Sequence, residues 1–396
     1  MDSPRKPQYI PLRVGYIKDL LKDNDLKLLI DFDNQETESY LNTYNQRDIR
    51  YVLNKKTFDF NKIMTQIGGR LKYIKSGTTG HTFKGLAKDN QVKDDYAVKI
   101  VAYPKKANYG NVYDIRRPEN AEIMMLRILS YFVITKQTPH IVLPVGTFNT
   151  SIKPFLSLSD KQYVNSKKYD EFLKKYKKGD YHSNVSVLIS EWANGGDLLE
   201  FLRKNYKSLK SIDWKVIFFQ LISTLAIIQV KYPSFRHNDL KANNILVHHI
   251  PFSDGKKNLF KYDVNGKKYG LPNIGLQIKI WDFDFACIPG IVDNLKVNAD
   301  WTDKINVKPE QNRYYDIHYF FSTLTKKGFF PQFWTEPEIP EKIKSFVKRL
   351  IPEKYKSGKY ITERGRILIN DEYTTPSYLL QNDPLFNKFR PKSDRV

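Results

Sequence analysis

The sequence predicts an α+β fold, with β-patterned segments in the first half of the chain and mostly helical segments in the second. Short β-patterned runs occur at 71–74, 96–100 and 185–190. Apolar residues recur at helical spacing over 118–132, and a long apolar helix is expected over 214–232. With 396 residues, 41% of them hydrophobic, the chain is long enough for two or three domains, or for one two-lobed enzyme with extensions.

Composition limits the partners and the compartment. Lys and Arg number 65 against 43 Asp and Glu, a net charge of +22, which favours acidic partners but also fits a solvated lysine-rich surface. A single cysteine, Cys287, excludes an internal disulfide and fits a reducing compartment. The N-terminus has no apolar signal region, and the stretch 216–230 is expected to be too short and too polar to span a bilayer. We therefore expect no transmembrane segment.

The first 66 residues are polar and rich in Asn, Asp and Lys, and we expect an extension without chemistry that packs on the first lobe. A strand at 71–74 then leads through a turn to a second strand that begins at Phe83. Two glycines three residues apart between strands let backbone amides approach phosphate oxygens, although many hairpins share this spacing. The turn comprises Gly77, Thr78, Thr79 and Gly80.

A lysine and a following helix form the next candidate pair. Lys99 lies in the strand 96–100, and Pro118 stands at a plausible first position of the helix 118–132. Only a carboxylate partner would distinguish Lys99 from an ordinary lysine at a strand edge. The helix supplies two candidates, Glu119 and Glu122.

A lysine-rich insertion, 149–184, follows a strand expected at 141–148. Its aromatic residues interleave with the lysines, as they would on a nucleic-acid or acidic-partner surface. A charged, solvated helix is the favoured interpretation. The residues are Lys153, Lys161, Lys167, Lys168, Lys174, Lys175, Lys177 and Lys178, with Tyr163, Tyr169, Phe172 and Tyr176.

The strand 185–190 runs into a connector with two glycines and then a helix, which Asp197 is placed to cap. A second insertion, 248–277, contains two expected hairpin turns, at 255–257 and 265–268. A β-run then ends at Asp282, and a helix that carries Asp316 near its start follows.

The stretch 235–247, FRHNDLKANNILV, carries the strongest chemical signal. It offers a carboxylate at Asp239, an amine at Lys241 and an amide oxygen at Asn244, followed by an apolar run. This set suits phosphoryl transfer, in which a protein mainly positions groups and screens charge. Asp239 would orient the attacking hydroxyl, Lys241 would neutralise the moving phosphate, and Asn244 would hold a metal ion.

Taken together, these segments resemble those of protein kinases in order and spacing. HNDLKANN is similar to the H-R-D-L-K-x-x-N loop, YAVKI to the V-A-I-K strand, and WDFDF to the D-F-G segment. The resemblance covers about residues 67–390. It implies a two-lobed fold with a small β-rich N-lobe at 67–190 and a larger, mostly helical C-lobe with the hinge at 191–396.

The resemblance also implies site roles and cofactors. Lys99 would pair with Glu122, preferred over Glu119, and contact the α- and β-phosphates of ATP. Gly77, Thr78, Thr79 and Gly80 would lie over the phosphates. The resemblance assigns the adenine and ribose contacts to Ala97, Glu191, Ala193 and Asp197. Asn244 and Asp282 would bind Mg²⁺, or Mn²⁺ in its place. Asp316 would hold the catalytic-loop backbone.

Three departures narrow the resemblance. Asn238 stands where the family usually has Arg, Asp284 replaces the Gly of D-F-G, and no A-P-E motif precedes Asp316. These features are similar to those of the virion-assembly serine/threonine kinases of poxviruses and their relatives in giant DNA viruses. The resemblance implies phosphorylation of virion or host proteins in the host cytoplasm, with packaging in the virion and acceptance of tyrosine left open. We also expect catalysis without loop phosphorylation, because Asn238 has no charge.

Two alternatives remain open from the sequence. Small-molecule kinases of the choline and aminoglycoside type carry similar H-N-D-L loops and D-F-D segments. A basic pseudokinase scaffold is the other alternative, against which the presence of all the core residues argues. Lys241, two residues after the expected base, favours serine and threonine as acceptors.

Overall fold

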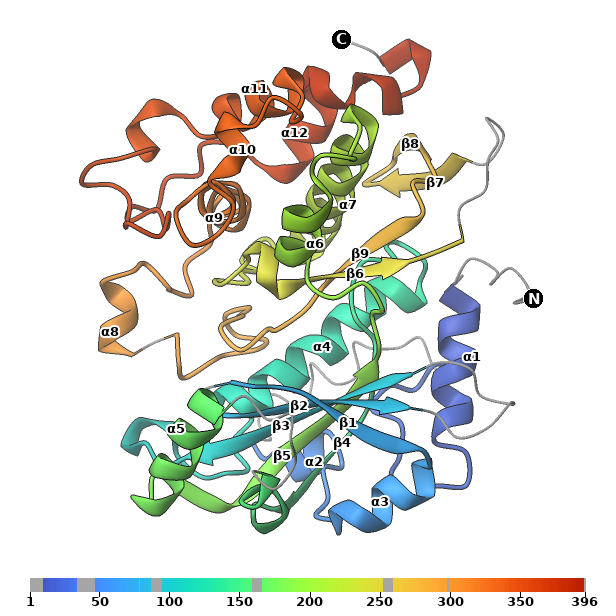
Figure 1. Cartoon of the computed structure of the whole chain (residues 1–396), viewed down its shortest axis with the longest axis vertical. Coiled ribbons are helices and arrows are strands. Elements are labelled where there is room, and N and C mark those ends of the chain that lie inside the picture. Colours follow the sequence, from blue (N-terminus) through green and yellow to red (C-terminus); the bar gives the residue numbers. More distant parts are fainter. Residues whose placement is uncertain are drawn as a thin grey trace. The chain divides into compact units, whose positions relative to one another are not determined.

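The computed structural model describes residues 10–33, 47–77, 79–86, 95–158, 166–251, 259–297 and 299–394 (Figure 1). The chain divides into two compact units. The sheet unit comprises Tyr9–Ile134 and Val142–Trp192, and the helical unit comprises chiefly Thr135–Ile141 and Ala193–Val396.

The sheet unit is built on a five-stranded antiparallel sheet. Its strand order is β1-β2-β3-β5-β4, so β3 occupies the centre. Burial alternates along β3, because successive side chains of a strand point to opposite faces of the sheet. The strands are β1 (Arg70–Ser76), β2 (Gly80–Leu86), β3 (Tyr96–Pro104), β4 (Pro144–Ser151) and β5 (Tyr181–Glu191). The strand expected at 141–148 therefore lies three residues further along the chain.

Helix α4 (Pro118–Ile134) begins at a proline, as expected for a first helical position, and nearly all of its side chains are buried. Leu29 and Ile30, from the N-terminal segment, form an apolar cluster with Ile123 and Ile134 of α4. The N-terminal segment also contains α1 (Ile10–Leu20), α2 (Ile49–Val52) and α3 (Phe60–Ile67).

Backbone hydrogen bonds join the N-terminal segment to β4. The Leu29 amide donates to the Val145 carbonyl at 2.9 Å, and the Phe58 amide donates to Asn149 at 2.9 Å. Asn149 in turn donates its own amide to Lys56 at 2.8 Å. The N-terminal segment is thus part of the hydrogen-bonded sheet layer.

The basic insertion contributes helix α5 (Ser166–Lys177) to the sheet unit. Tyr169 and Phe172 of α5 are each 1% exposed and pack on His81 of β2, with ring centroids 5.5 and 4.5 Å apart. Buried rings cannot stack on bases, which disfavours the nucleic-acid interpretation of these two residues. Lys167, Lys174, Lys177 and Lys178 are exposed, whereas Lys161 and Tyr163 lie outside the described residues.

The helical unit surrounds helix α7. Its helices are α6 (Leu198–Asn205), α7 (Ser211–Lys231), α8 (Asp300–Asp303), α9 (Tyr315–Leu324), α10 (Gln332–Thr335), α11 (Glu341–Leu350) and α12 (Pro376–Asn382). Two antiparallel strand pairs complete it, β6 (Ile245–His249) with β9 (Leu276–Ile280), and β7 (Leu259–Val264) with β8 (Lys267–Pro272).

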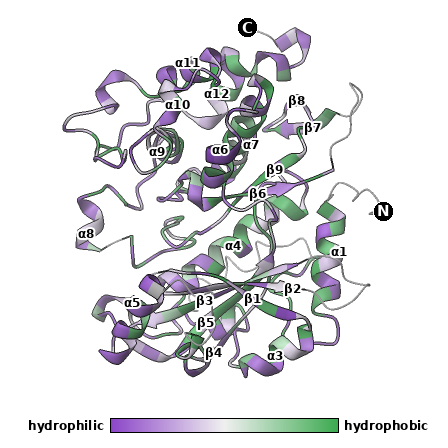
Figure 2. Cartoon of the chain, viewed as in Figure 1, coloured by the Kyte–Doolittle hydropathy of each residue, from purple (hydrophilic) through white to green (hydrophobic). Residues whose placement is uncertain are grey.

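Helix α7 is apolar along most of its length (Figure 2). It extends beyond the apolar stretch 216–230, which we expected to be too short and too polar to span a bilayer. By length and composition alone, α7 is the one described helix that could cross a membrane. Most of it is buried inside the unit, where Phe218 packs on Phe321 at 4.8 Å and Phe219 on Tyr269 at 5.1 Å. This burial is typical of a core helix.

The turn predicted at 265–268 joins β7 to β8. Asn265 and Gly266 both adopt left-handed backbone conformations, as a two-residue hairpin turn requires. The turn predicted at 255–257 lies outside the described residues. Helix α12 ends at Asn382, before Pro384, and a 3-10 helix, Pro384–Phe389, follows.

Lys55 anchors the N-terminal segment inside the sheet unit. Its side chain is 1% exposed, and its ammonium group hydrogen bonds to Tyr103 at 2.9 Å, Asn120 at 3.2 Å and Ser186 at 2.7 Å. Burial lowers the pKa of Lys55 to about 7, although the charge of Glu119 opposes this effect.

Lys55 should therefore make the free energy of unfolding depend on pH above about pH 7. Between the lowered folded-state pKa of about 7 and the ordinary value in the unfolded chain, the unfolded state binds more protons. The free energy of unfolding should then rise with pH, by up to about 1.4 kcal/mol per pH unit. Chemical denaturation at pH 7 and pH 9.5 would show a steeper rise for the wild type than for Lys55→Met. Lys56→Met, at an exposed neighbour, is the control, and equal slopes for all three proteins would contradict the prediction.

Candidate active site

A buried carboxylate on α9 holds the loop that precedes β6. Asp316 is 0% exposed and accepts the backbone amides of His237 at 2.7 Å and Asn238 at 2.9 Å. Burial raises the pKa of Asp316, while the charges of His237 and Arg236 and the two amide bonds lower it. Two otherwise unpaired loop amides are thereby satisfied, as expected from the sequence.

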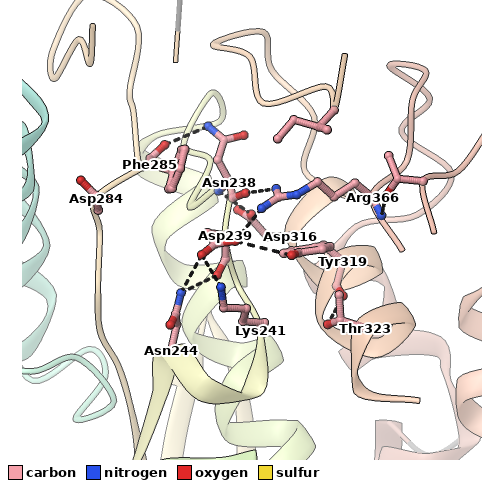
Figure 3. Close-up of polar contacts among 12 residues, drawn as sticks. Asn238, Asp239, Lys241, Asn244, Asp284, Phe285, Asp316, Tyr319, Thr323 and Arg366 are labelled. Carbon is pink, nitrogen blue, oxygen red and sulfur yellow. Dashed lines mark hydrogen bonds and ion pairs between the residues drawn. The ribbon is translucent and has the colours of Figure 1, made fainter. Parts of the chain in front are cut away.

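The Asp239 carboxylate is contacted at both oxygens (Figure 3). Oδ2 accepts Lys241 at 2.8 Å and the Asn244 amide at 3.0 Å. Oδ1 accepts the Arg366 guanidinium at 2.5 Å and the Tyr319 hydroxyl at 3.5 Å. The structure thus brings together the three residues that the sequence singled out, and it adds a fourth, Arg366.

Asn238 has a backbone and a side-chain reason to be asparagine. Its φ of +62° lies in the left-handed region, which asparagine tolerates better than arginine does. Its side-chain amide donates to the carbonyls of Phe285 at 3.1 Å and Lys308 at 3.4 Å. These neutral hydrogen bonds tie the loop to the segment that follows Asp282.

Asn244 and Asp282 flank two adjacent strands, β6 and β9. Asn244 comes directly before β6 and Asp282 two residues after β9, and Ile245 pairs with Ile280 in the ladder between these strands. The Trp281 amide also donates to the Asn244 carbonyl at 3.1 Å. The amide nitrogen of Asn244 donates to Asp239, so its Oδ1 is the atom that could bind a metal ion.

The donor chemistry of this pair fits Mg²⁺, which prefers oxygen and usually keeps water and substrate phosphate as its other ligands. Within the described ranges no group of three His, Cys, Asp or Glu side chains could hold a metal. A metal here would therefore be bound by few protein groups. Asp282 adopts φ +65°, a strained conformation for a residue other than glycine that is often found at functional sites.

The segment after Asp282 is fastened at several points. Phe283 is 0% exposed and packs on His237 with ring centroids 5.0 Å apart. Asp284, which replaces the usual Gly, forms an ion pair with Lys296. The Asn294 side chain donates to the Asp284 carbonyl at 3.0 Å. We expect these contacts to oppose outward rotation of the segment.

In the sheet unit, Lys99 of β3 pairs with Glu122 of α4 at 2.6 Å, and their side chains are 18% and 5% exposed. Glu119, the other candidate, instead pairs with the buried Arg117 at 3.1 Å. The geometry therefore chooses between two carboxylates that the residue pattern alone left open. Ala97 lies two residues before Lys99 and is paired with Ser190 of β5.

The glycine turn is organised partly by its own backbone. The Gly77 amide donates to the Gly80 carbonyl at 2.8 Å, and the Thr79 carbonyl accepts the Ala102 amide at 2.8 Å. A Cβ at Gly80 would lie 1.8 Å from the Ile100 carbonyl oxygen, so strand pairing alone requires glycine there. Thr78 lies outside the described residues.

The connector after β5 has two anchors. In the helical unit, the Gly195 amide donates to the Val247 carbonyl at 2.8 Å, and Asp197 caps α6 through the Glu200 amide at 2.9 Å. Ala193, the residue expected to meet adenine through its amide, is buried.

In the sheet unit, the Glu191 side chain is buried against α1. It accepts Arg13 at 2.9 and 2.5 Å and the Leu143 amide at 2.8 Å. Arg13 is 3% exposed. No signal in the sequence indicated this pair, because its members are 178 residues apart and α1 has no recognisable motif.

Comparison with known proteins gives one family match. The family model described as poxvirus serine/threonine protein kinase matches residues 175–386. This range contains the Asp239 loop, Asp282, Asp316 and Arg366.

Relatives extend the match to nearly the whole chain. A protein named serine/threonine-protein kinase R400, from Acanthamoeba polyphaga mimivirus, is 48% identical over 96% of this chain and 80% of its own length. Serine/threonine-protein kinase 2 of fowlpox virus is 26% identical over 62% of this chain and 50% of its own. The protein of the same name from vaccinia virus, strain L-IVP, is 31% identical over 34% and 29%.

The Arg13–Glu191 pair yields a stability prediction. Arg13→Met would leave the Glu191 carboxylate buried without this cation, and we expect a loss of about 3–5 kcal/mol in the free energy of unfolding. Lys18→Met, which removes an exposed pair with Asp33 from the same helix, should cost only about 0–1 kcal/mol. Urea denaturation would compare the two variants. Similar losses for both would show that Arg13 is not a structural anchor.

Proposed function

This chain belongs to the poxvirus serine/threonine protein kinase family, and from that premise we propose that it transfers the γ-phosphate of Mg²⁺-bound ATP to serine and threonine hydroxyls of virion or host proteins. The observation that carries the proposal is the arrangement at Asp239. Its carboxylate is held by Lys241 and Asn244, and the strand next to that of Asn244 ends near Asp282.

Each residue has a role that its surroundings support. Asp239 orients the acceptor hydroxyl and takes its proton, and Lys241, 2.8 Å from Asp239, balances charge on the transferred phosphoryl group. Lys99, fixed by Glu122, contacts the nucleotide phosphates. Asn244 and Asp282 would hold Mg²⁺, or Mn²⁺, which when bound neutralises charge on those phosphates.

The nucleotide contacts form a second part of the proposal. The carbonyl of Glu191 and the amide of Ala193 would bond adenine, with Ala97 packed against the base and Asp197 near the ribose. The turn Gly77–Gly80 would cover the phosphates. Support comes from the buried anchoring of Glu191 and from the position of Ala97 beside Ser190.

We infer the acceptors from the net charge of the chain and the place of action from its single cysteine. A net charge of +22 favours acidic protein substrates. Lys241 favours serine and threonine, with tyrosine as an additional acceptor to be tested. We place the enzyme in the host cytoplasm, with packaging in the virion, and the buried Cys287, which forms no disulfide, fits a reducing compartment.

Phosphate transfer tests the proposal directly. Asp239→Asn should lower kcat by about 10²–10⁴-fold and leave nucleotide binding intact, because only the positioned base is lost. Asp282→Ala should abolish activity that depends on Mg²⁺. Labelled ATP would be supplied with a basic protein, casein, choline or an aminoglycoside as acceptor. Asp170→Asn, at an exposed site on α5, is the matched control.

The outcomes separate the alternatives. Label on serine or threonine of protein, lost in Asp239→Asn and kept in Asp170→Asn, supports the proposal. Label on choline or the aminoglycoside would replace it with a small-molecule kinase. Nucleotide binding without any transfer would indicate a pseudokinase.

Asn238 leads to a prediction about regulation. Because it fastens the Asp282 segment through neutral hydrogen bonds, we expect catalysis without phosphorylation between Asp284 and Asp316. Treating the purified enzyme with a protein phosphatase should leave kcat unchanged, with mass spectrometry as the check on phosphate content. A phosphatase-sensitive kcat that returns on rephosphorylation of this segment would contradict the prediction.

A further inference from the structure

Arg366 reaches the Asp239 loop from a distant turn. It follows Asp239 by 127 residues and lies between α11 and α12. The turn is closed by a bond from the Thr362 amide to the Arg366 carbonyl at 2.9 Å, and by one from the Arg366 amide to the Thr362 hydroxyl at 2.9 Å.

Gly365 seats this turn against α9. Its φ of +89° favours glycine, and a Cβ would lie 2.6 Å from the Ser322 hydroxyl oxygen. The preceding residue, Arg364, is exposed, whereas the side chain of Arg366 is 9% exposed. The backbone of the turn therefore directs Arg366, and not Arg364, inward.

The Arg366 guanidinium is surrounded by groups that fix it. Besides Oδ1 of Asp239, it donates to the Asn238 carbonyl and to the Tyr315 hydroxyl at 3.0 Å. It also lies over the Tyr319 ring, 4.0 Å from the centroid. A planar guanidinium can donate several hydrogen bonds and stack on a ring at the same time, which a lysine ammonium cannot do.

The two oxygens of Asp239 face different surroundings. Oδ1 meets Arg366 and Tyr319, which are both buried. Oδ2 meets the buried Asn244 and also Lys241, whose side chain is 28% exposed. Rotation of the carboxylate would break both sets of contacts. Oδ2 is therefore kept on the side of Lys241, the most exposed of the side chains that contact this carboxylate.

We propose that Arg366 is a positioning residue for phosphoryl transfer, which holds Oδ1 of Asp239 so that Oδ2 faces the acceptor hydroxyl. This inference rests on the proposed kinase function. It adds that the cationic support of the catalytic loop is built into the fold through Arg366, with no need for a phosphorylated residue.

The test compares kcat with nucleotide affinity. Arg366→Met should lower kcat by about 10²-fold, the typical effect of a misplaced reacting group, and leave ATP affinity unchanged. Arg366→Lys should give an intermediate kcat, because it keeps the charge and loses the fork. Arg364→Met, at the exposed neighbour in the same turn, is the control and should match the wild type.

A second readout separates positioning from a merely structural role. If Arg366 acts through Asp239, adding Arg366→Met to Asp239→Asn should lower kcat no further. Millimolar guanidinium should also restore part of kcat in Arg366→Met and none in the double variant. Circular dichroism and ATP binding would verify that each variant is folded.

Each outcome supports or overturns the positioning role of Arg366. Reduced kcat with intact ATP binding, and no further loss in the Asp239→Asn background, supports the inference. A wild-type kcat in Arg366→Met, or an equal extra loss in the Asp239→Asn background, overturns it. If Arg366→Met does not fold, Arg366→Lys decides in the same way, and a wild-type kcat there overturns it. If the wild type and Arg364→Met transfer no phosphate, the proposed function fails and this inference falls with it.

Discussion

The buried carboxylate of Asp316 is the contact on which the active-site loop depends. It accepts hydrogen bonds from the backbone amides of His237 and Asn238. These loop amides are not part of the backbone hydrogen bonding of a helix or strand. Because these residues directly precede Asp239, fixing their backbone fixes the start of the Asp239 side chain. The energetic condition is strict, since a buried carboxylate is tolerated only when hydrogen bonds and nearby charge compensate its lost hydration. Arg236 and His237 supply that charge.

The departures from the usual kinase pattern share one physical theme. Asn238 replaces an arginine and fastens the following segment by neutral hydrogen bonds. Asp284 replaces a glycine and gains Lys296 as an ionic partner. Arg366 brings a cation to Asp239 from a remote turn. In each case a fixed internal contact stands where flexibility or a regulated charge would otherwise be expected, which agrees with a site that is organised without modification.

The N-terminal segment belongs to the sheet unit as much as the strands do. Lys55 and Arg13 carry buried polar groups from it into the layer that holds Glu191 and Ser186. A charged group that is buried in this way is costly to leave unmatched, so the segment cannot detach without exposing or orphaning its partners. The basic insertion shows the opposite distribution, with Tyr169 and Phe172 inward against His81. Lys167, Lys174, Lys177 and Lys178 face solvent.

The sequence alone determined the mixed fold and the order of the elements, because these depend on local periodicity. Its short motifs singled out Lys99, Asp239, Lys241, Asn244 and Asp282 as candidate site residues. It left the partner of Lys99 open between Glu119 and Glu122 when judged from spacing, and the structure places Glu122 there. The contacts of Arg13, Lys55 and Arg366 were invisible, since each joins residues far apart in the chain. Only the tertiary structure could decide them, because burial makes a charge choose a partner and burial is a property of the folded chain.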